Sequence, residues 1–258
     1  MTDQPPPIQG SSQGVNTNPV SVMFRTSKDK PWVTYVIMGI TIFFYLLQVI
    51  SQRITAGSVD LPELFGAKVN QWILAGEVWR LVTPILLHGS LLHISFNMYA
   101  LFALGPGLEK YYGHKRFFWL YLIGGYAGNV LSFLFSPAAS IGASTAIFGL
   151  VAAESIFIYR NRMLFGERAR SMLINMGFVV IVNLTFGIVQ TGIDNWGHLG
   201  GLIGGAVFAW FAGPVYKIQP GIAGLELKDI HGKNEAVWGA LWSAGLFTAI
   251  VIGKFLVK

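Results

Sequence analysis

Long apolar segments dominate this chain and restrict the folds that it can adopt. Seven of them approach the roughly 20 apolar residues with which a helix crosses a bilayer. Because hydrocarbon offers no water to backbone N–H and C=O groups, such segments have to be helices. Hydrophobic residues make up 53% of the 258 and charged residues only 12%, which excludes an ordinary soluble domain. We therefore predict an all-α polytopic membrane protein with spans near residues 32–51, 82–104, 116–136, 142–159, 171–190, 196–214 and 236–256.

The segments outside the predicted core differ from it in composition. Residues 1–30 are rich in Pro, Gln, Ser, Asn and Gly, which predicts a disordered segment. They lack the apolar stretch and cleavage site of a secretory signal, so the first span is expected to remain in the mature protein. We divide the rest into a transmembrane core at residues 31–214, a loop at 215–235 and an additional helix at 236–258.

The basic residues predict the orientation of the bundle. Most of the 18 lysines and arginines fall in the N-terminal segment and in alternate loops. Cytoplasmic loops carry an excess of Lys and Arg, so the N-terminus and the 215–235 loop are predicted to be cytoplasmic. The net charge of +6 then reflects these loops and not a nucleic-acid partner. The missing import signal favours a bacterial plasma (inner) membrane over a eukaryotic secretory-pathway membrane.

Two reactive residues lie inside predicted spans. Ser144 stands near the start of the fourth span and His198 near the start of the sixth. Both spans run from outside to inside in the predicted orientation, so the two side chains fall at a similar depth near the outer leaflet. A serine hydroxyl needs a base to become a nucleophile, and ionisable groups in a membrane usually mark a functional site. The alternatives are that Ser144 caps or packs a helix and that His198 bonds a backbone carbonyl.

Glycines around the histidine favour a close contact between these two spans. Gly197, Gly201 and Gly205 recur at every fourth position, a spacing that lets another helix backbone approach closely. The fourth span has small residues of its own at positions 143, 146, 149, 152 and 153. Close approach of the two helices is what a hydrogen bond between serine and histidine requires.

The second span carries two further polar groups. His93 and Asn97 are four residues apart and share one helix face. Both can donate hydrogen bonds, and with the backbone N–H of Ser144 they predict an oxyanion site. A polar clamp between helices is the alternative. His88 falls on the opposite side of an ideal helix and is predicted to tether the outer loop.

No carboxylate is expected to complete a triad. Asp194 precedes His198 by four residues but is predicted to be a solvated charge in a short exposed loop. Glu154 lies deeper and is expected to pair with a basic residue such as Arg160, or to have a buried regulatory role. The chain has no cysteine, so thiolate metal sites are impossible, and we expect neither a metal nor a cofactor. The default is therefore a two-residue Ser/His mechanism.

Four motifs together resemble the rhomboid family of intramembrane serine proteases, from about residue 31 to 214. Each is weak alone, but their order, spacing and shared membrane side make the joint signal strong. They are Trp79-Arg80 in the first outer loop, His88-Gly-Ser-Leu-Leu-His93-Ile-Ser-Phe-Asn97, Gly142-Ala143-Ser144 and Gly197-His198-Leu199-Gly200-Gly201.

The resemblance implies a six-helix core and an assignment of roles. Ser144 would be the nucleophile and His198 the general base, with His93, Asn97 and the Ser144 amide as oxyanion donors. The substrates would be membrane proteins in the lipid bilayer, cleaved in or near their transmembrane helices. The span at 236–256 resembles the extra C-terminal helix of one rhomboid subgroup. The loop that carries Trp79 and Arg80 would lie in the outer interface.

Two positions depart from the family pattern. The residue after the nucleophile is usually Gly, and here it is Thr145, whose side chain could crowd the oxyanion pocket. Phe148 stands where some members have a Tyr that stacks on the histidine, and phenylalanine can still stack. Two other functions stay open. One is a catalytically inactive rhomboid-like protein that binds transmembrane helices and guides their trafficking or degradation. The other is a small transporter with a polar midplane site.

Overall fold

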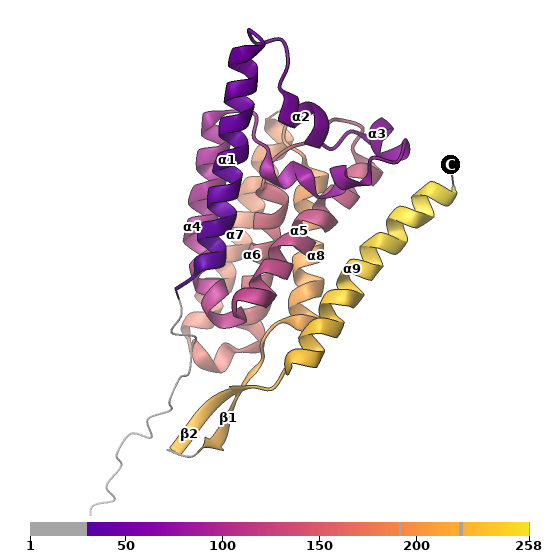
Figure 1. The fold of residues 1–258 in the computed structure, drawn as a ribbon. Coiled ribbons are helices and arrows are strands. Elements are labelled where there is room, and N and C mark those ends of the chain that lie inside the picture. Colours follow the sequence, from indigo (N-terminus) through magenta and orange to yellow (C-terminus); the bar gives the residue numbers. More distant parts are fainter. Residues whose placement is uncertain (1–29, 191, 222–223, 258) are drawn as a thin grey trace, which may run out of the picture.

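Seven long helices form the body of the chain in the computed structural model, which describes residues 30–190, 192–221 and 224–257 (Figure 1). Apart from Lys30, the segment predicted to be disordered lies outside these residues. Six of the helices pack side by side, while α9 leans away toward its C-terminal end (Figure 1). The seven are α1 (Trp32–Ile54), α4 (Leu91–Tyr112), α5 (His114–Phe135), α6 (Ser144–Arg160), α7 (Arg168–Val189), α8 (Asn195–Ala212) and α9 (Lys233–Leu256).

Length and composition make five of these helices, α1, α4, α5, α7 and α9, able to cross a membrane. The remaining two are the helices that carry Ser144 and His198. α6 has only 17 residues, and α8 begins with polar residues. Many residues of both are buried, because the two helices pack closely against each other and against α5. The prediction of an all-α, multi-pass membrane protein is confirmed.

For the second predicted span, residues 82–104, the predicted start of the helix is wrong. α4 starts at Leu91, where the Ser90 side chain caps it by accepting a hydrogen bond from a backbone N–H. Ile85 and Leu87 are apolar because they are buried in the packed end of the bundle, not because they cross the bilayer. The loop before α4 instead forms short elements: α2 (Leu61–Gly66), α3 (Asn70–Leu74) and two 3₁₀ turns, η1 (Val78–Leu81) and η2 (Thr83–Leu86).

Residues 215–235, predicted as a loop, contain an antiparallel hairpin. Its strands are β1 (Tyr216–Gly221) and β2 (Gly224–Asp229), and Tyr216 pairs with Asp229 at the open end. The hairpin lies at the end of the bundle where α1 and α9 begin (Figure 1). It connects α8 to α9 outside the helical body, so it leaves the prediction of a helical membrane core unchanged.

A buried glutamate fixes the start of α1. Glu109, near the end of α4, accepts hydrogen bonds from the backbone N–H groups of Val33 and Thr34 and from the Thr34 hydroxyl. The first N–H groups of a helix have no partner within that helix, and a carboxylate at this end also interacts favourably with the helix dipole. This contact, which the sequence analysis missed, ties α1 to α4.

Glycines bring α8 against the backbone of α6. A Cβ added to Gly201 would lie 2.0 Å from the carbonyl oxygen of Thr145, and one added to Gly205 would lie 2.1 Å from that of Gly149. Real Cβ atoms do not approach other atoms so closely, so neither site has room for a side chain. The close approach expected of the fourth and sixth spans is therefore present.

The same helix presents a second pair of glycines to α5. A Cβ on Gly200 would lie 2.7 Å from the carbonyl oxygen of Ala127, and one on Gly204 would lie 2.3 Å from the Ala127 side chain. In membranes, helix association depends on such close packing, because lipid tails are as apolar as the side chains. α8 is thus held between two neighbours that it touches nearly backbone to backbone.

Replacement of Gly201 by Ala tests this packing. The added methyl group has to push α8 away from α6, so we expect Gly201→Ala to lower the free energy of unfolding by roughly 1–3 kcal/mol, the usual cost of overpacking. The measurement is unfolding of the purified protein in detergent. Gly245→Ala in α9 is the matched control, since a Cβ there meets nothing within 4 Å. Equal stability of the two variants would contradict the packing account.

Candidate active site

Ser144 and His198 come from different helices and meet at the end of the bundle opposite the hairpin. Ser144 Oγ and His198 Nε2 are 2.9 Å apart, a hydrogen-bonding distance. Ser144 is the first residue of α6, and His198 lies in the first turn of α8. Phe148 stacks on the imidazole, with ring centroids 4.2 Å apart and the planes inclined by 11°. The predicted pair thus has the distance that proton transfer needs, and packing fixes its ring.

The turn before Ser144 is held by the segment that precedes α4. Gly142 has a φ of +134°, which favours glycine, and its N–H donates to the carbonyl of Pro84 at 2.9 Å. The Ala143 N–H donates to Nε2 of His88 at 3.3 Å. His88 is almost fully buried and belongs to no helix. Its contact agrees with the predicted tether and reaches the residue next to the nucleophile.

His93 faces the same turn. Its Nε2 would lie 2.8 Å from a Cβ placed on Gly142, and the Ser144 Oγ would lie 3.6 Å from that same point. Asn97 is buried on the inner face of α4, and its amide donates to the backbone carbonyl of His93 at 2.9 Å. The structure therefore brings the His93 ring next to Ser144. One of the two amide protons of Asn97 is already hydrogen-bonded within its own helix.

Thr145, the residue expected to crowd the oxyanion pocket, packs with its side chain between α5 and α8. Its side chain is 3% exposed and lies against Gly128 of α5 and Gly197 of α8. A Cβ on Gly128 would be 2.5 Å from the Thr145 Cβ, so the glycine provides the room that the threonine occupies. The volume added by the departure from the family pattern is thus accommodated between α5 and α8.

Asp194 is not the solvated charge that the sequence analysis predicted. Its side chain caps α8 by accepting a hydrogen bond from the Gly197 N–H at 2.9 Å, and it also accepts one from the Ser132 hydroxyl of α5. Its backbone carbonyl accepts from the His198 N–H. An Asp just before a helix is the usual N-cap signal, which would have predicted this role. The Asp194 carboxylate holds the helix start that carries the histidine and does not bond the imidazole.

The predicted pairing of Glu154 with Arg160 is wrong. Arg160 instead donates to the backbone carbonyl of Trp210 and lies over the ring of that tryptophan. The Oε2 atom of Glu154 is buried and has no hydrogen-bond partner among the described residues. Within the same residues, no three His, Asp or Glu side chains are grouped as a metal site requires.

A buried lysine joins the loop after α1 to the turn before the nucleophile. Lys68 Nζ donates to the carbonyls of Ser136 and Ala138 at 2.7 and 2.8 Å, and its backbone pairs with Ser140. Burial lowers the pKa of the ammonium group to about 8, and the carboxylate of Asp194 opposes that shift. Nothing local in the sequence distinguishes Lys68 from a solvated loop lysine, so this role was not predicted.

Arg80 organises the rest of this loop. Its guanidinium donates to the carbonyls of Ala67 and Leu64 at 2.8 and 2.7 Å and lies 4.3 Å from the ring centroid of Trp72. The indole of Trp79 donates to the carbonyl of Phe65. Arg80 is 2% exposed, so it acts inside the loop and not on its surface. Together with Lys68, it makes the loop a fixed structure beside the candidate site.

Comparison with known proteins gives the chain a family. The family model described as the Rhomboid domain matches residues 75–215, more than half of the chain. The chain is 44% identical over 179 residues to rhomboid protease GluP of Bacillus subtilis (strain 168), covering 68% of this chain and 34% of that protein. It is 35% identical over 168 residues to RHOMBOID-like protein 9, chloroplastic, of Arabidopsis thaliana, covering 64% and 38%.

A third relative, the putative rhomboid protease YdcA of Bacillus subtilis (strain 168), is 33% identical over 144 residues, covering 55% of this chain and 70% of YdcA. The chain spans only about a third of the length of the first two relatives, so their whole-protein activities do not transfer with the match. The region that the family model matches nevertheless contains Ser144, His198, His93 and Asn97. This chain belongs to the rhomboid family.

Proposed function

We propose that this protein is an intramembrane serine endopeptidase that cleaves peptide bonds in or near the transmembrane helices of membrane-protein substrates. The observation that carries the proposal is the 2.9 Å distance between Ser144 Oγ and His198 Nε2 at the end of two closely packed helices. The family to which the chain belongs supports the reaction class. The catalytic roles of individual residues are part of the proposal.

In the first step, His198 acts as general base. Its Nε2 accepts the proton of Ser144 as Oγ attacks the scissile carbonyl carbon, and the proton then passes to the leaving amine when the C–N bond breaks. Nε2 has to carry the lone pair, so the ring proton resides on Nδ1. Nδ1 is buried and has no hydrogen-bond partner within the described ranges. Stacking on Phe148 therefore orients the ring, a task that a carboxylate performs in a triad.

The negative charge of the tetrahedral intermediate needs donors near Ser144. The backbone N–H groups at the start of α6 have no partner within that helix and lie at its positive dipole end. The His93 ring faces the same turn, and Asn97 retains one amide proton beyond the one that it gives to the His93 carbonyl. Preorganised donors of this kind are often the largest single contribution to catalysis.

In the second step, water hydrolyses the acyl-enzyme, with His198 again accepting the proton. The substrate segment has to unwind at the cleavage site, because carbonyls within a helix are already hydrogen-bonded and shielded. We also propose that the N-terminus is cytoplasmic and that the protein resides in a bacterial plasma membrane. The distribution of the 18 basic residues supports this orientation, which puts Ser144 toward the outer leaflet.

Removal of either member of the pair tests the proposal directly. We expect Ser144→Ala and His198→Ala to lower cleavage of a single-span substrate in proteoliposomes by roughly four orders of magnitude or more. Ser155→Ala is the control, because Ser155 lies on the same helix and donates only to the carbonyl of Val151. Cleavage that survives in Ser144→Ala would refute the assignment. If the unchanged protein neither cleaves nor reacts with a fluorophosphonate at Ser144, it is an inactive family member.

The oxyanion donors have a separate signature. We expect His93→Ala and Asn97→Ala each to lower kcat by about 10²–10³ with little change in KM, because the lost interaction forms only in the transition state. Asn183→Ala in α7 is the matched control, since Asn183 also donates to a carbonyl four residues earlier but is exposed, whereas Asn97 is buried. An equal effect of Asn183→Ala, or a change confined to KM, would count against an oxyanion role.

Asp194 is proposed as a positioning residue for the base. Asp194→Ala removes the cap of α8 and the link to Ser132, so we expect a loss of about 1 kcal/mol in unfolding free energy together with slower fluorophosphonate labelling of Ser144. Asp194→Asn keeps the capping oxygen and should stay close to the unchanged protein in both measurements. If Asp194→Asn lowers the unfolding free energy and the labelling rate as much as Asp194→Ala does, the negative charge of Asp194, and not its capping hydrogen bond, positions His198.

A further inference from the structure

A cavity of about 1100 Å³ lies at the end of the bundle opposite Ser144, between the start of α5, the start of α9 and the hairpin. Its floor is apolar and includes Tyr112 and Phe208, which are 4% and 0% exposed. Trp119, Val237 and Leu241 line it as well and are about half exposed, so the cavity opens sideways toward the lipid-facing surface of α5 and α9. The volume is slightly larger than that of ordinary ligand pockets.

The polar part of this cavity is cationic. Lys110, Lys115 and Arg116 line it, against Asp229 as the one carboxylate among the lining residues. Both lysines have exposed side chains at the junction of α4 and α5, where these helices leave the apolar region. The cavity therefore combines a basic mouth with an apolar interior.

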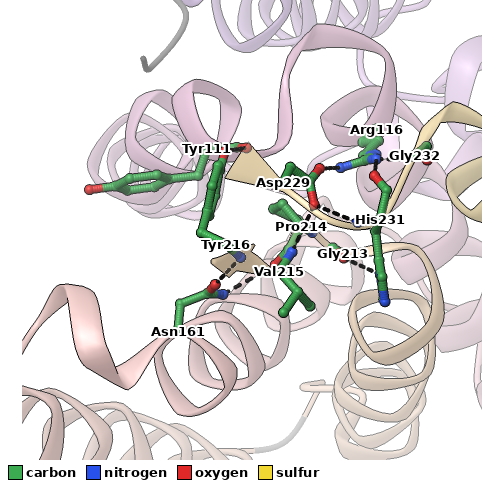
Figure 2. A network of polar contacts seen from close by, with 10 residues as sticks. All are labelled: Tyr111, Arg116, Asn161, Gly213, Pro214, Val215, Tyr216, Asp229, His231 and Gly232. Atoms are coloured by element: carbon green, nitrogen blue, oxygen red, sulfur yellow. Dashed lines mark hydrogen bonds and ion pairs between the residues drawn. The ribbon is translucent and has the colours of Figure 1, made fainter. Parts of the chain in front are cut away.

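The single carboxylate is already neutralised. Asp229 accepts hydrogen bonds from the Arg116 guanidinium at 2.5 Å and from the backbone N–H groups of Val215 and His231 (Figure 2). Arg116 also donates to the carbonyl of Gly232. Arg116 and Asp229 thus bind each other and the chain around them, which leaves the charges of the two lysines available to a ligand.

The hairpin wall of the cavity is fixed by the rest of the network (Figure 2). The Tyr216 hydroxyl donates to the carbonyl of Tyr111, and the Tyr216 N–H donates to the side chain of Asn161 at the end of α6. On the other side, α9 closes onto α8 at Gly239, where a Cβ would lie 2.7 Å from the Phe211 backbone. These contacts keep α9 and the hairpin in place without filling the space between α9 and α5.

We propose that this cavity binds an anionic phospholipid. Its headgroup phosphate would lie between Lys110 and Lys115, and an acyl chain would follow the apolar interior past Ala240 between α5 and α9. Basic pockets between transmembrane helices recognise anionic headgroups in this way. A soluble phosphate compound would use the lysines but leave the apolar interior unfilled, so the combination of charge and apolar volume favours a lipid. The site is separate from the proposed catalytic residues, and its test does not depend on proteolysis.

The test measures retention of phosphatidylglycerol by the full chain. The protein is reconstituted in vesicles of phosphatidylglycerol and phosphatidylcholine, extracted gently, and examined by native mass spectrometry with titration of the anionic lipid. We expect one tightly retained phosphatidylglycerol and no retained phosphatidylcholine. Lys110→Gln with Lys115→Gln should weaken its binding by about 10- to 30-fold. Arg162→Gln with Arg170→Gln is the matched control, since it removes the same charge outside the cavity but at the same end of the bundle.

The apolar half of the site has its own pair of variants. Ala240→Phe fills the cavity and keeps both lysines, so it should also abolish tight retention, whereas Ala249→Phe on the exposed face of α9 should not. Unfolding in detergent verifies that each variant is folded. The proposal would be overturned if the lysine double variant still bound phosphatidylglycerol tightly. It would also be overturned if the arginine double variant lost as much phosphatidylglycerol binding as the lysine double variant. Equal retention of phosphatidylcholine would overturn it too, as would displacement of the lipid by millimolar inorganic phosphate, which would identify a site for the phosphate group alone.

Discussion

Contact between α8 and its two neighbours through glycine is the constraint on which the rest of the structure depends. Gly201 and Gly205 leave α8 separated from α6 by little more than van der Waals distance, and Gly200 does the same toward α5. Without a hydrophobic effect between helices in lipid, close packing is what holds them together. The same contact sets the 2.9 Å distance between Ser144 and His198, so stability and the proposed chemistry share one origin.

The two ends of the bundle are organised by different means. At the end with Ser144, buried cations of the loop after α1 donate to backbone carbonyls, with Lys68 holding the turn between α5 and α6 and Arg80 holding the loop itself. At the other end, the carboxylates of Glu109 and Asp229 accept from backbone N–H groups and neighbouring side chains. Charged groups at the ends thus satisfy the backbone where it leaves regular structure, while the middle is held by packing.

The sequence predicted those features that depend on residues close together in the chain. Apolar length identified the spans, and the glycine spacing identified the contact between the fourth and sixth. Prediction failed where a residue serves a distant partner. Ile85 and Leu87 were assigned to a span because burial in protein and burial in lipid select the same side chains. Lys68 and Glu109 bond to segments that only the fold brings near, and no local pattern marks them. Asp194 does have a local N-cap signal, but its bond to Ser132 of α5 is long-range.

The sequence by itself determined that this chain is a multi-pass helical membrane protein of the rhomboid family, since apolar length and a few spaced motifs suffice for that. It also identified the small set of polar residues that such a membrane core carries. Only the tertiary structure decided that Ser144 and His198 lie within hydrogen-bonding distance, that Thr145 packs between α5 and α8, and that a basic-rimmed cavity lies between the starts of α5 and α9. The reason is physical, because these features are distances between helices, and such distances follow from three-dimensional packing that no single segment contains.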